Sequence, residues 1–218
     1  LLALGVRGSL RLGGGWGSSG SAVLLDACRG GHFEMVELLL KSGVDARRGD
    51  AWGRSALHVA RSPEMAELLV RHGADVNARN ARGVTPLHIA SSHSAGAVQL
   101  RLDNGADPFA VDQFLRTPLH MAARSGKAAA ARALVALDAD LSAPSLSGAT
   151  PLHEAMSARG ESGVVGALLS NRVGAPNDVD GDGRSALRLA IENGAWGAVR
   201  QLIGRGAWCD ASDVAKAK

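Results

Sequence analysis

The chain has 218 residues, of which 46% are apolar and 21% charged, the balance of an ordinary globular protein. Its formal net charge is +3, and basic residues alternate with acidic ones along the sequence. Bulk charge therefore does not indicate nucleic acid or an anionic membrane as a partner. No apolar run approaches 18 residues, so the sequence predicts no membrane insertion.

The first segment, residues 1–20, is rich in glycine and serine and contains Arg7 and Arg11 but no acidic residue. This composition is typical of a flexible leader. It also fits the remnant of an organelle transit peptide, which is rich in arginine and serine and poor in acids. We therefore expect an intracellular protein, cytoplasmic by default, with an organelle as the alternative if the segment is a processed transit peptide.

Residues 21–210 contain copies of one pattern. Four segments match closely, and they begin at Ser55, Thr85, Thr117 and Thr150. Weaker copies begin at Ala22 and Ser185, so that successive copies start 30 to 35 residues apart. Each copy is followed by a second apolar segment, such as "MAELLVRHGAD" at 65–75. Self-similarity at this period is the signature of stacked repeat architectures.

Both segments of each copy have the features of short helices. A Thr or Ser is a good helix N-cap, and the proline that follows it in "TPLH" suits the first helical position. We expect a core made by one leucine and one alanine from each first helix. The second helices should end at glycines with left-handed backbone, which are Gly43, Gly73, Gly105 and Gly206. Asp138 takes this position in the fourth copy and should also be left-handed.

These motifs resemble the ankyrin repeat over residues 21–210, with repeats starting near 21, 50, 80, 112, 145 and 180 and with degenerate first and last copies. The resemblance implies an all-α solenoid of stacked helix-turn-helix units with projecting β-hairpin loops. Residues 211–218 would be a C-terminal tail. One pair of helices cannot bury its own apolar face, so neighbouring units must stack.

Two copies depart from the pattern in length. The second is three residues short between Ala60 and Met65, which predicts an irregular helix junction. The fifth has extra residues at 160–163 and 171–173, which would bend the stack or expose a loop.

The histidines His58, His88, His120 and His153 recur once per repeat. Because neighbouring repeats lie roughly 10 Å apart, these side chains cannot share one zinc ion, and we predict a structural role for them. Cys28 should be an inert core thiol, and Cys209 lies too far along the stack to form a disulfide with it. No catalytic constellation, cofactor motif or metal-ligand spacing appears, so we expect no enzyme activity, no cofactor and no metal.

The stretch "DVDGDGR" at 178–184 begins like a calcium-binding loop. Such a loop needs a bidentate glutamate at its twelfth position, which here is Leu189. In repeat register the stretch aligns with "DAWGR" at 50–54, so we interpret Asp180 and Gly183 as turn residues of a hairpin and Asp182 as the counterpart of Trp52.

The resemblance implies that a protein partner docks on the hairpin tips and the concave face of the first helices. The free positions there predict this partner-binding set: Trp52, Arg54, Arg82, Phe114, Arg116, Met121, Arg124, Glu154 and Arg184. Phe33 and Trp196 share a helix-packing position and are expected in the core, whereas Trp208 could serve either cap packing or a contact.

These features favour a non-catalytic interaction module or scaffold that is monomeric by itself and binds protein, not nucleic acid. The alternative is an accessory structural subunit fixed in a large multiprotein assembly. Fold alone does not decide between them.

Overall fold

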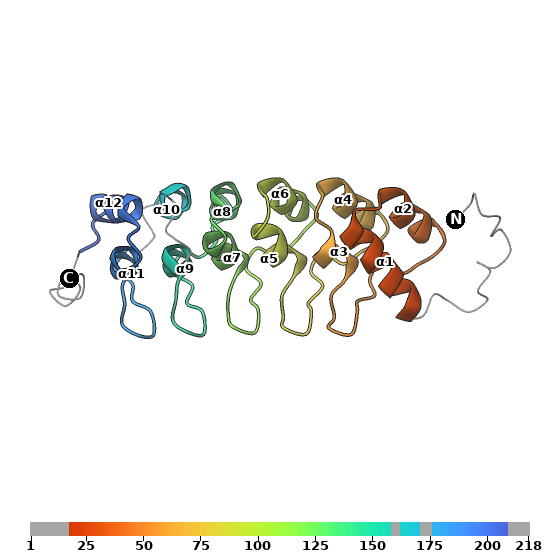
Figure 1. Ribbon diagram of the computed structural model, residues 1–218, viewed down its shortest axis with the longest axis horizontal. Coiled ribbons are helices and arrows are strands. Elements are labelled where there is room, and N and C mark those ends of the chain that lie inside the picture. The colour runs from red at the N-terminus through yellow and green to blue at the C-terminus, as the bar shows by residue number, and fades with distance from the viewer. Residues whose placement is uncertain (1–17, 158–161, 171–175, 209–218) are drawn as a thin grey trace.

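The structure is a computed structural model that describes residues 18–157, 162–170 and 176–208 (Figure 1). These ranges contain twelve α-helices and only two isolated β-bridges, Gly49 with Ser55 and Val179 with Ser185. The helices are α1 (Ser18–Gly30), α2 (Phe33–Lys41), α3 (Ala56–Val59), α4 (Pro63–Arg71), α5 (Pro86–Ser91), α6 (Ala95–Asp103), α7 (Pro118–Arg124), α8 (Ala128–Val135), α9 (Pro151–Ser157), α10 (Ser162–Leu168), α11 (Ala186–Glu192) and α12 (Trp196–Gly204). The prediction of an all-α repeat fold is confirmed.

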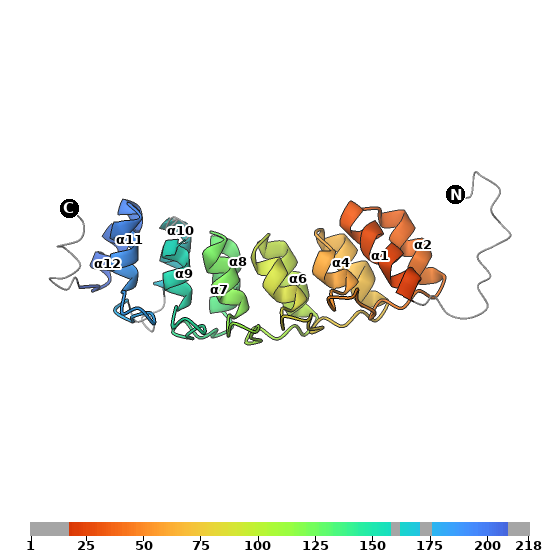
Figure 2. The same cartoon turned by 60° about the horizontal axis from the view of Figure 1, so that its bottom comes forward.

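The helices form consecutive pairs that stack along one long axis, with the first and last pairs at opposite ends (Figures 1 and 2). The first helix of each pair lies in one row and the second helix in another, and the loops between pairs project on the side of the first helices (Figure 1). The hairpin side, as we call it, is the surface formed by the first helices α3, α5, α7, α9 and α11 and by the loops 49–55, 79–85, 111–117, 144–150 and 179–185.

The predicted boundaries need one correction at the N-terminus. Helix α1 begins at Ser18, so residues 18–20 are helical and do not belong to the leader predicted over 1–20. The remainder of that leader, 1–17, lies outside the described residues. So do the predicted tail 211–218, Cys209 and most of the extra residues at 160–163 and 171–173.

The first helices begin at the predicted caps. Thr85 has extended backbone, and its hydroxyl accepts a hydrogen bond from the His88 amide, while Nδ1 of His88 accepts one from the Thr85 amide at 3.2 Å. Pro86 occupies the first turn, where its missing amide hydrogen costs nothing. The same reciprocal cap forms at Ser55 with His58 and at Thr117 with His120. The helix caps predicted from the sequence are therefore present at each of these three helix starts.

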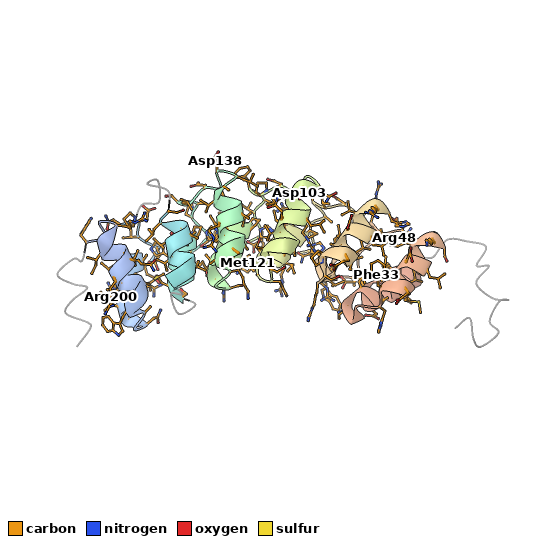
Figure 3. All side chains as sticks on the ribbon, turned by 90° about the horizontal axis from the view of Figure 1, so that it is seen from above. Phe33, Arg48, Asp103, Met121, Asp138 and Arg200 are labelled. Carbon is orange, nitrogen blue, oxygen red and sulfur yellow. The ribbon has the colours of Figure 1, made fainter. Side chains whose placement is uncertain are left out.

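The left-handed helix ends are also confirmed. Gly43, Gly73, Gly105 and Gly206 have φ between 81° and 88°. Asp138 has φ of 58° at the turn after α8, where Figure 3 labels it. Leu115, in the third hairpin, has the same φ of 58°, which the sequence pattern did not indicate. A branched apolar residue is strained in this region, where glycine is free to lie.

The core between successive pairs is made mainly of leucine, alanine and valine side chains. The predicted residues are all buried: Leu57, Leu87, Leu119, Leu152, Leu187, Ala60, Ala90, Ala122, Ala155 and Ala190. The buried apolar side chains form two separate clusters, one within residues 24–74 and the other within 87–207. The division falls between the second pair (α3, α4) and the third (α5, α6).

The second pair is irregular, as its shortened sequence predicted. Helix α3 has four residues, compared with seven in α7, and Ala60 at its end has extended backbone. The helix therefore stops before the next turn could provide amide donors for its last carbonyl groups.

Arg101 of α6 provides the missing hydrogen-bond donors, a role that the repeat pattern did not predict. Its Nη2 donates to the carbonyl oxygens of Leu57 and Ala60 at 3.0 and 3.2 Å, and its Nη1 donates to Ala97 at 3.0 Å. The residue is 1% exposed and forms no ion pair with any described carboxylate. Burial lowers the pKa of Arg101 to about 10, so the guanidinium remains charged at neutral pH.

Among the described residues, no helix combines the length and the apolar character that crossing a membrane requires.

Candidate functional site

In three of the hairpins, the side chain of one aspartate accepts the hydrogen bonds that hold the turn. Asp50 Oδ1 accepts hydrogen bonds from the amides of Trp52 and Arg54, at 3.0 and 2.9 Å. The Arg54 carbonyl in turn accepts from the Asp50 amide at 3.0 Å and closes the loop. Asp112 and Asp180 make the corresponding bonds in their own hairpins. This is the local chemistry by which short acidic side chains favour tight turns.

Consecutive hairpins are joined through their backbones. The Trp52 carbonyl accepts from the Ala81 amide at 2.9 Å, and the Arg82 carbonyl accepts from the Gln113 amide at the same distance. Equivalent bonds run from Leu146 to Phe114 and from Gly181 to Ser147, each at 2.8 Å. The tips are thus a continuous, hydrogen-bonded row, and side chains on them are held at fixed spacing.

The repeated histidines have the predicted structural role. Nδ1 of His88 faces the amide and hydroxyl of Thr85, and Nε2 lies 2.9 Å from the carbonyl of Arg116 in the next hairpin. Because Nδ1 accepts from the amide, the proton resides on Nε2, which donates to that carbonyl. His58, His120 and His153 make the same pair of links, to Val84, Ala149 and Arg184. Each therefore ties a first helix to the following hairpin.

Burial keeps these imidazoles neutral. It lowers the pKa of His120 to about 4, and it lowers the pKa values of His58, His88 and His153 in the same direction. Both ring nitrogens are already occupied, so none is free to act as a general base. Cys28 is 2% exposed, so its predicted place in the core is confirmed, and burial raises the pKa of its thiol to about 12.

The predicted row of arginines is present, but each is bound to its own hairpin. Nη2 of Arg54, Arg116 and Arg184 lies 2.7 to 2.9 Å from an oxygen of Asp50, Asp112 and Asp180 respectively. Burial by itself would raise the pKa of Asp112, but hydrogen bonds from Arg116 and from the Phe114 amide outweigh it and lower that pKa. The positive charges in this row are therefore largely compensated.

Two of these arginines also lie over aromatic rings. The guanidinium carbon of Arg54 is 4.9 Å from the centroid of the Trp52 ring, and that of Arg116 is 4.9 Å from the Phe114 ring. Trp52 nevertheless stays 65% exposed and Phe114 42% exposed. Stacking fixes each ring on the hairpin tip while leaving its outer face open to a partner, at an entropic cost already met in the free protein.

Six of the nine predicted residues line two hollows of the hairpin side. The first has a volume of about 320 Å³ and is lined by Trp52, Arg54, Asn80, Ala81 and Arg82. It lies between the first two hairpins. It thus brings together three of the predicted residues, with an exposed indole and an exposed Arg82 that has no ion pair to a described carboxylate.

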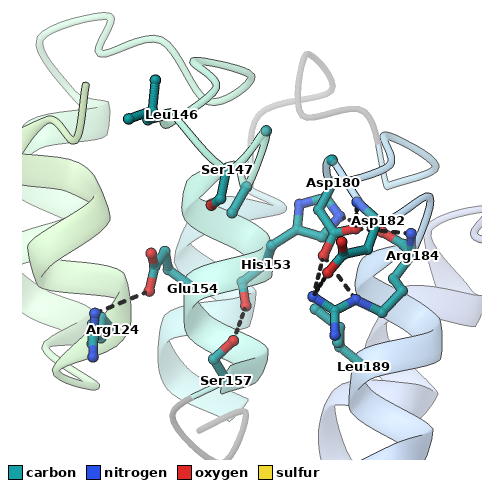
Figure 4. Close-up of a pocket in the computed structure, with 13 residues that line it drawn as sticks. Arg124, Leu146, Ser147, His153, Glu154, Ser157, Asp180, Asp182, Arg184 and Leu189 are labelled. Carbon is teal, nitrogen blue, oxygen red and sulfur yellow. Dashed lines mark hydrogen bonds and ion pairs between the residues drawn. The ribbon is translucent and has the colours of Figure 1, made fainter. Parts of the chain in front are cut away.

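The second hollow, of about 690 Å³, lies between α7, α9 and α11 and contains Arg124, Glu154 and Arg184 (Figure 4). Arg124 lies 3.9 Å from Glu154, and Arg184 pairs with Asp182 at 2.8 Å as well as with Asp180. This hollow is larger and its charges are mixed. Phe114, Arg116 and the half-buried Met121 line neither hollow, although Phe114 lies on the row of tips between them.

The acidic stretch 178–184 forms the last hairpin, as its register predicted. Asp180 anchors the turn, and Ser185 caps α11. Oxygens of both Asp180 and Asp182 are paired with Arg184, so they are not arranged around a cation. In the part of the chain that the structure describes, no three His, Cys, Asp or Glu side chains come together in a way that could hold a metal ion.

The prediction that Phe33 and Trp196 are core residues is wrong. Phe33 is 39% exposed and Trp196 is 63% exposed. Each is the first residue of a second helix, α2 or α12. Its side chain points away from the core, whereas the apolar residues that follow it in the helix pack against the core. Trp208, which the sequence left open, is 65% exposed, and its amide donates a hydrogen bond to Asn177 at 3.1 Å.

The comparison with protein families agrees with this geometry. A family model described as ankyrin repeats (3 copies) matches residues 10–80, 61–145 and 87–180. Because these matches span most of the chain, the chain belongs to the ankyrin repeat family. Ankyrin repeats are in general protein–protein interaction modules, and the family is typically non-catalytic.

Proposed function

We propose that this chain is a non-catalytic scaffold that holds a protein partner along its hairpin side. The observation that carries the proposal is the row of hairpin tips, which presents Trp52 and Phe114 on a hydrogen-bonded backbone. Exposed, pre-ordered aromatic side chains flanked by arginine are the residue types that dominate binding energy in interfaces. Arg82, Met121, Arg124 and Glu154 would supply the surrounding contacts.

The test compares two double variants that are matched in residue type and exposure. Trp52→Ala/Phe114→Ala removes the tip aromatics, whereas Phe33→Ala/Trp196→Ala removes one Phe and one Trp of similar exposure from second helices. Proteins captured by the unaltered chain would be identified and quantified with each variant. We expect the tip variant to lose the principal partner by about tenfold or more and the control to retain it.

Equal retention by both variants would contradict docking on the hairpin side. Thermal unfolding of each variant, with a midpoint near that of the unaltered chain, would show that loss of capture is not loss of fold.

A permanent place in a large assembly is the second candidate, and the exposed Phe33, Trp196 and Trp208 favour it. These aromatic side chains lie at the two ends of the stack, outside the hairpin side, so they offer separate contacts to neighbouring subunits. A fixed subunit would sediment with a large particle at high salt, and its Phe33→Ala/Trp196→Ala variant would be released. A chain that sediments alone under all conditions would exclude this role.

A further inference from the structure

The shortened second pair leaves a notch in the hairpin side between α3 and α5. Its volume is about 230 Å³, and Val59, Ala60 and Ile89 form apolar parts of its wall. That volume is below the range of pockets that enclose a small molecule, about 300–1,000 Å³, so it suits a single side chain of a larger partner.

The rim of the notch is basic. Arg29, Arg54 and Arg61 line it, and no carboxylate does. Two of these arginines have a counter-charge outside the notch, since Arg29 pairs with Asp26 and Arg54 with Asp50, each at 2.7 Å. Arg61 is exposed and forms no ion pair with any carboxylate in the described ranges. The rim therefore has an uncompensated positive charge.

A second uncompensated charge lies behind the wall. Ala60 and Ala97 both line the notch, and the carbonyl groups of both accept hydrogen bonds from the buried guanidinium of Arg101. Nε of Arg101 is buried without a hydrogen-bond partner among the described residues. Since a charge in a poorly solvated interior is screened much less than one at the surface, its field reaches into the notch.

We propose that this notch binds a carboxylate side chain in an acidic segment of the protein partner. The proposal rests on the proposed function and adds a location and a polarity to it. Arg54 borders both the notch and the hollow beneath Trp52 and Arg82, so one extended segment can occupy the two in succession. The C-terminal hollow attracts the same segment less, because its Arg124 and Arg184 are already paired with Glu154, Asp180 and Asp182. The acidic part of the partner is thereby placed at the second and third helix pairs.

The test uses a short fluorescein-labelled peptide of alternating glutamate and serine, titrated with the full chain at low salt and followed by fluorescence anisotropy. Arg61→Glu reverses the charge at the rim. Arg200→Glu is the matched control, since Arg200 is an exposed arginine of α12 at the far end of the stack and the change in net charge is identical (Figure 3). We expect the first variant to weaken binding about tenfold or more and the control to weaken it less than about twofold.

Equal weakening by both variants would overturn the proposal, because it would show attraction by net charge alone. An oligothymidine that binds more tightly than the peptide, with the same dependence on Arg61, would also overturn it and assign the notch to nucleic acid. Capture of the principal partner by Arg61→Glu separates this proposal from the function on which it rests. If Arg61→Glu captured the partner as well as the unaltered chain and bound the peptide equally tightly, the notch would not be the binding site. The proposed scaffold function of the hairpin side would then still stand.

Discussion

The first two helix pairs and the last four are built from the same motif but meet across an unusual boundary. On five of the second helices a leucine occupies one equivalent buried position: Leu39, Leu69, Leu134, Leu168 and Leu202. On α6 that position holds Arg101, which is just as buried. Its three hydrogen bonds go to carbonyl groups, two of them at the end of the shortened α3. A deletion in one repeat is thus compensated by a substitution in the next.

The same boundary divides the hairpin side by charge. N-terminal to it and at it, Arg29, Arg54, Arg61 and Arg82 surround the notch and the smaller hollow. Towards the C-terminus the larger hollow mixes arginine with Glu154 and Asp182. The shortened α3 therefore affects both the packing of the core and the charge of the hairpin side. Substitutions in each region can test whether α3 causes the difference between them.

The largest loss of stability is expected when an arginine is placed at the equivalent leucine position of a C-terminal pair, where no shortened helix lies beside it. Leu134→Arg would bury a guanidinium beside α7, whose seven residues leave no free carbonyl like that of Leu57. We expect the free energy of unfolding to fall by about 4 kcal/mol, the order found for uncompensated buried charge. Denaturant unfolding measures it. Ala129→Arg, on the exposed face of the same helix, should change stability by no more than about 0.5 kcal/mol.

Acid should destabilise both regions through the histidines. Burial lowers the pKa of His120 from 6.5 to about 4, so the unfolded chain binds the proton more tightly than the folded one. Stability is complete above pH 6.5 and is lost as the pH falls towards 4, by about 3 kcal/mol for this residue. Unfolding curves across that range measure the loss. His120→Asn, which keeps a polar side chain, should flatten the pH dependence, and an unchanged profile would contradict the role of His120.

Removing the guanidinium should have a smaller effect. Arg101→Leu restores the leucine of the other second helices but leaves the carbonyls of Leu57 and Ala60 without donors. We expect a loss of about 2 kcal/mol, since each unpaired buried carbonyl costs about 1–3 kcal/mol and removal of a buried charge offsets part of it. A variant as stable as the unaltered chain would show that the guanidinium is not needed there.

The histidines provide a local readout of the same substitution. Burial is the main cause of the low pKa of His58, and the charge of Arg101 lowers it further. Arg101→Leu should therefore raise the pKa of His58 and leave that of His120 unchanged, as followed by NMR titration. Equal shifts at both residues would mean that the change spreads beyond the boundary.

The smallest expected effect concerns the hairpins. Four of them have a left-handed glycine, at Gly53, Gly83, Gly148 and Gly183, whereas the third has Leu115. The left-handed backbone costs a leucine roughly 1–2 kcal/mol, and the extra freedom of glycine in the unfolded chain takes back roughly 0.5–1 kcal/mol. Leu115→Gly should therefore stabilise the fold by about 0.5 kcal/mol in denaturant unfolding. A loss of stability would mean that the exposed Leu115 side chain makes contacts worth more than its strain.

Much of the fold follows from the sequence because its signals are local. Caps such as Thr85, prolines such as Pro86 and terminal glycines such as Gly43 act within a few residues, and each was predicted from spacing alone. Phe33 and Trp196 were misplaced because pattern position does not reveal which way the first residue of a helix projects. The prediction treated an aromatic residue as buried, whereas its exposure depends on whether a neighbouring pair covers it.

The sequence predicted which residues lie on the hairpin side, but it did not predict which of their charges are paired. The positions of Arg54, Arg116 and Arg184 follow from the repeat, and the sequence also contains the aspartate four residues before each of them with which it pairs. The notch could not be inferred in the same way, since it depends on α3 and α6, segments far apart in the sequence. The sequence does contain a charged residue at the leucine position of α6 and a deletion in the preceding repeat, but it does not indicate that the two segments meet in space.

The most direct test of this account is the coupling between Arg101 and the length of α3. Replacing residues 61–62 by the five residues 123–127 would restore the three missing positions of the second repeat. Arg101→Leu would then be measured by denaturant unfolding in both backgrounds. If the two features compensate each other, the substitution costs about 2 kcal/mol in the natural chain and less than about 0.5 kcal/mol in the extended one. The same cost in both backgrounds would contradict the account.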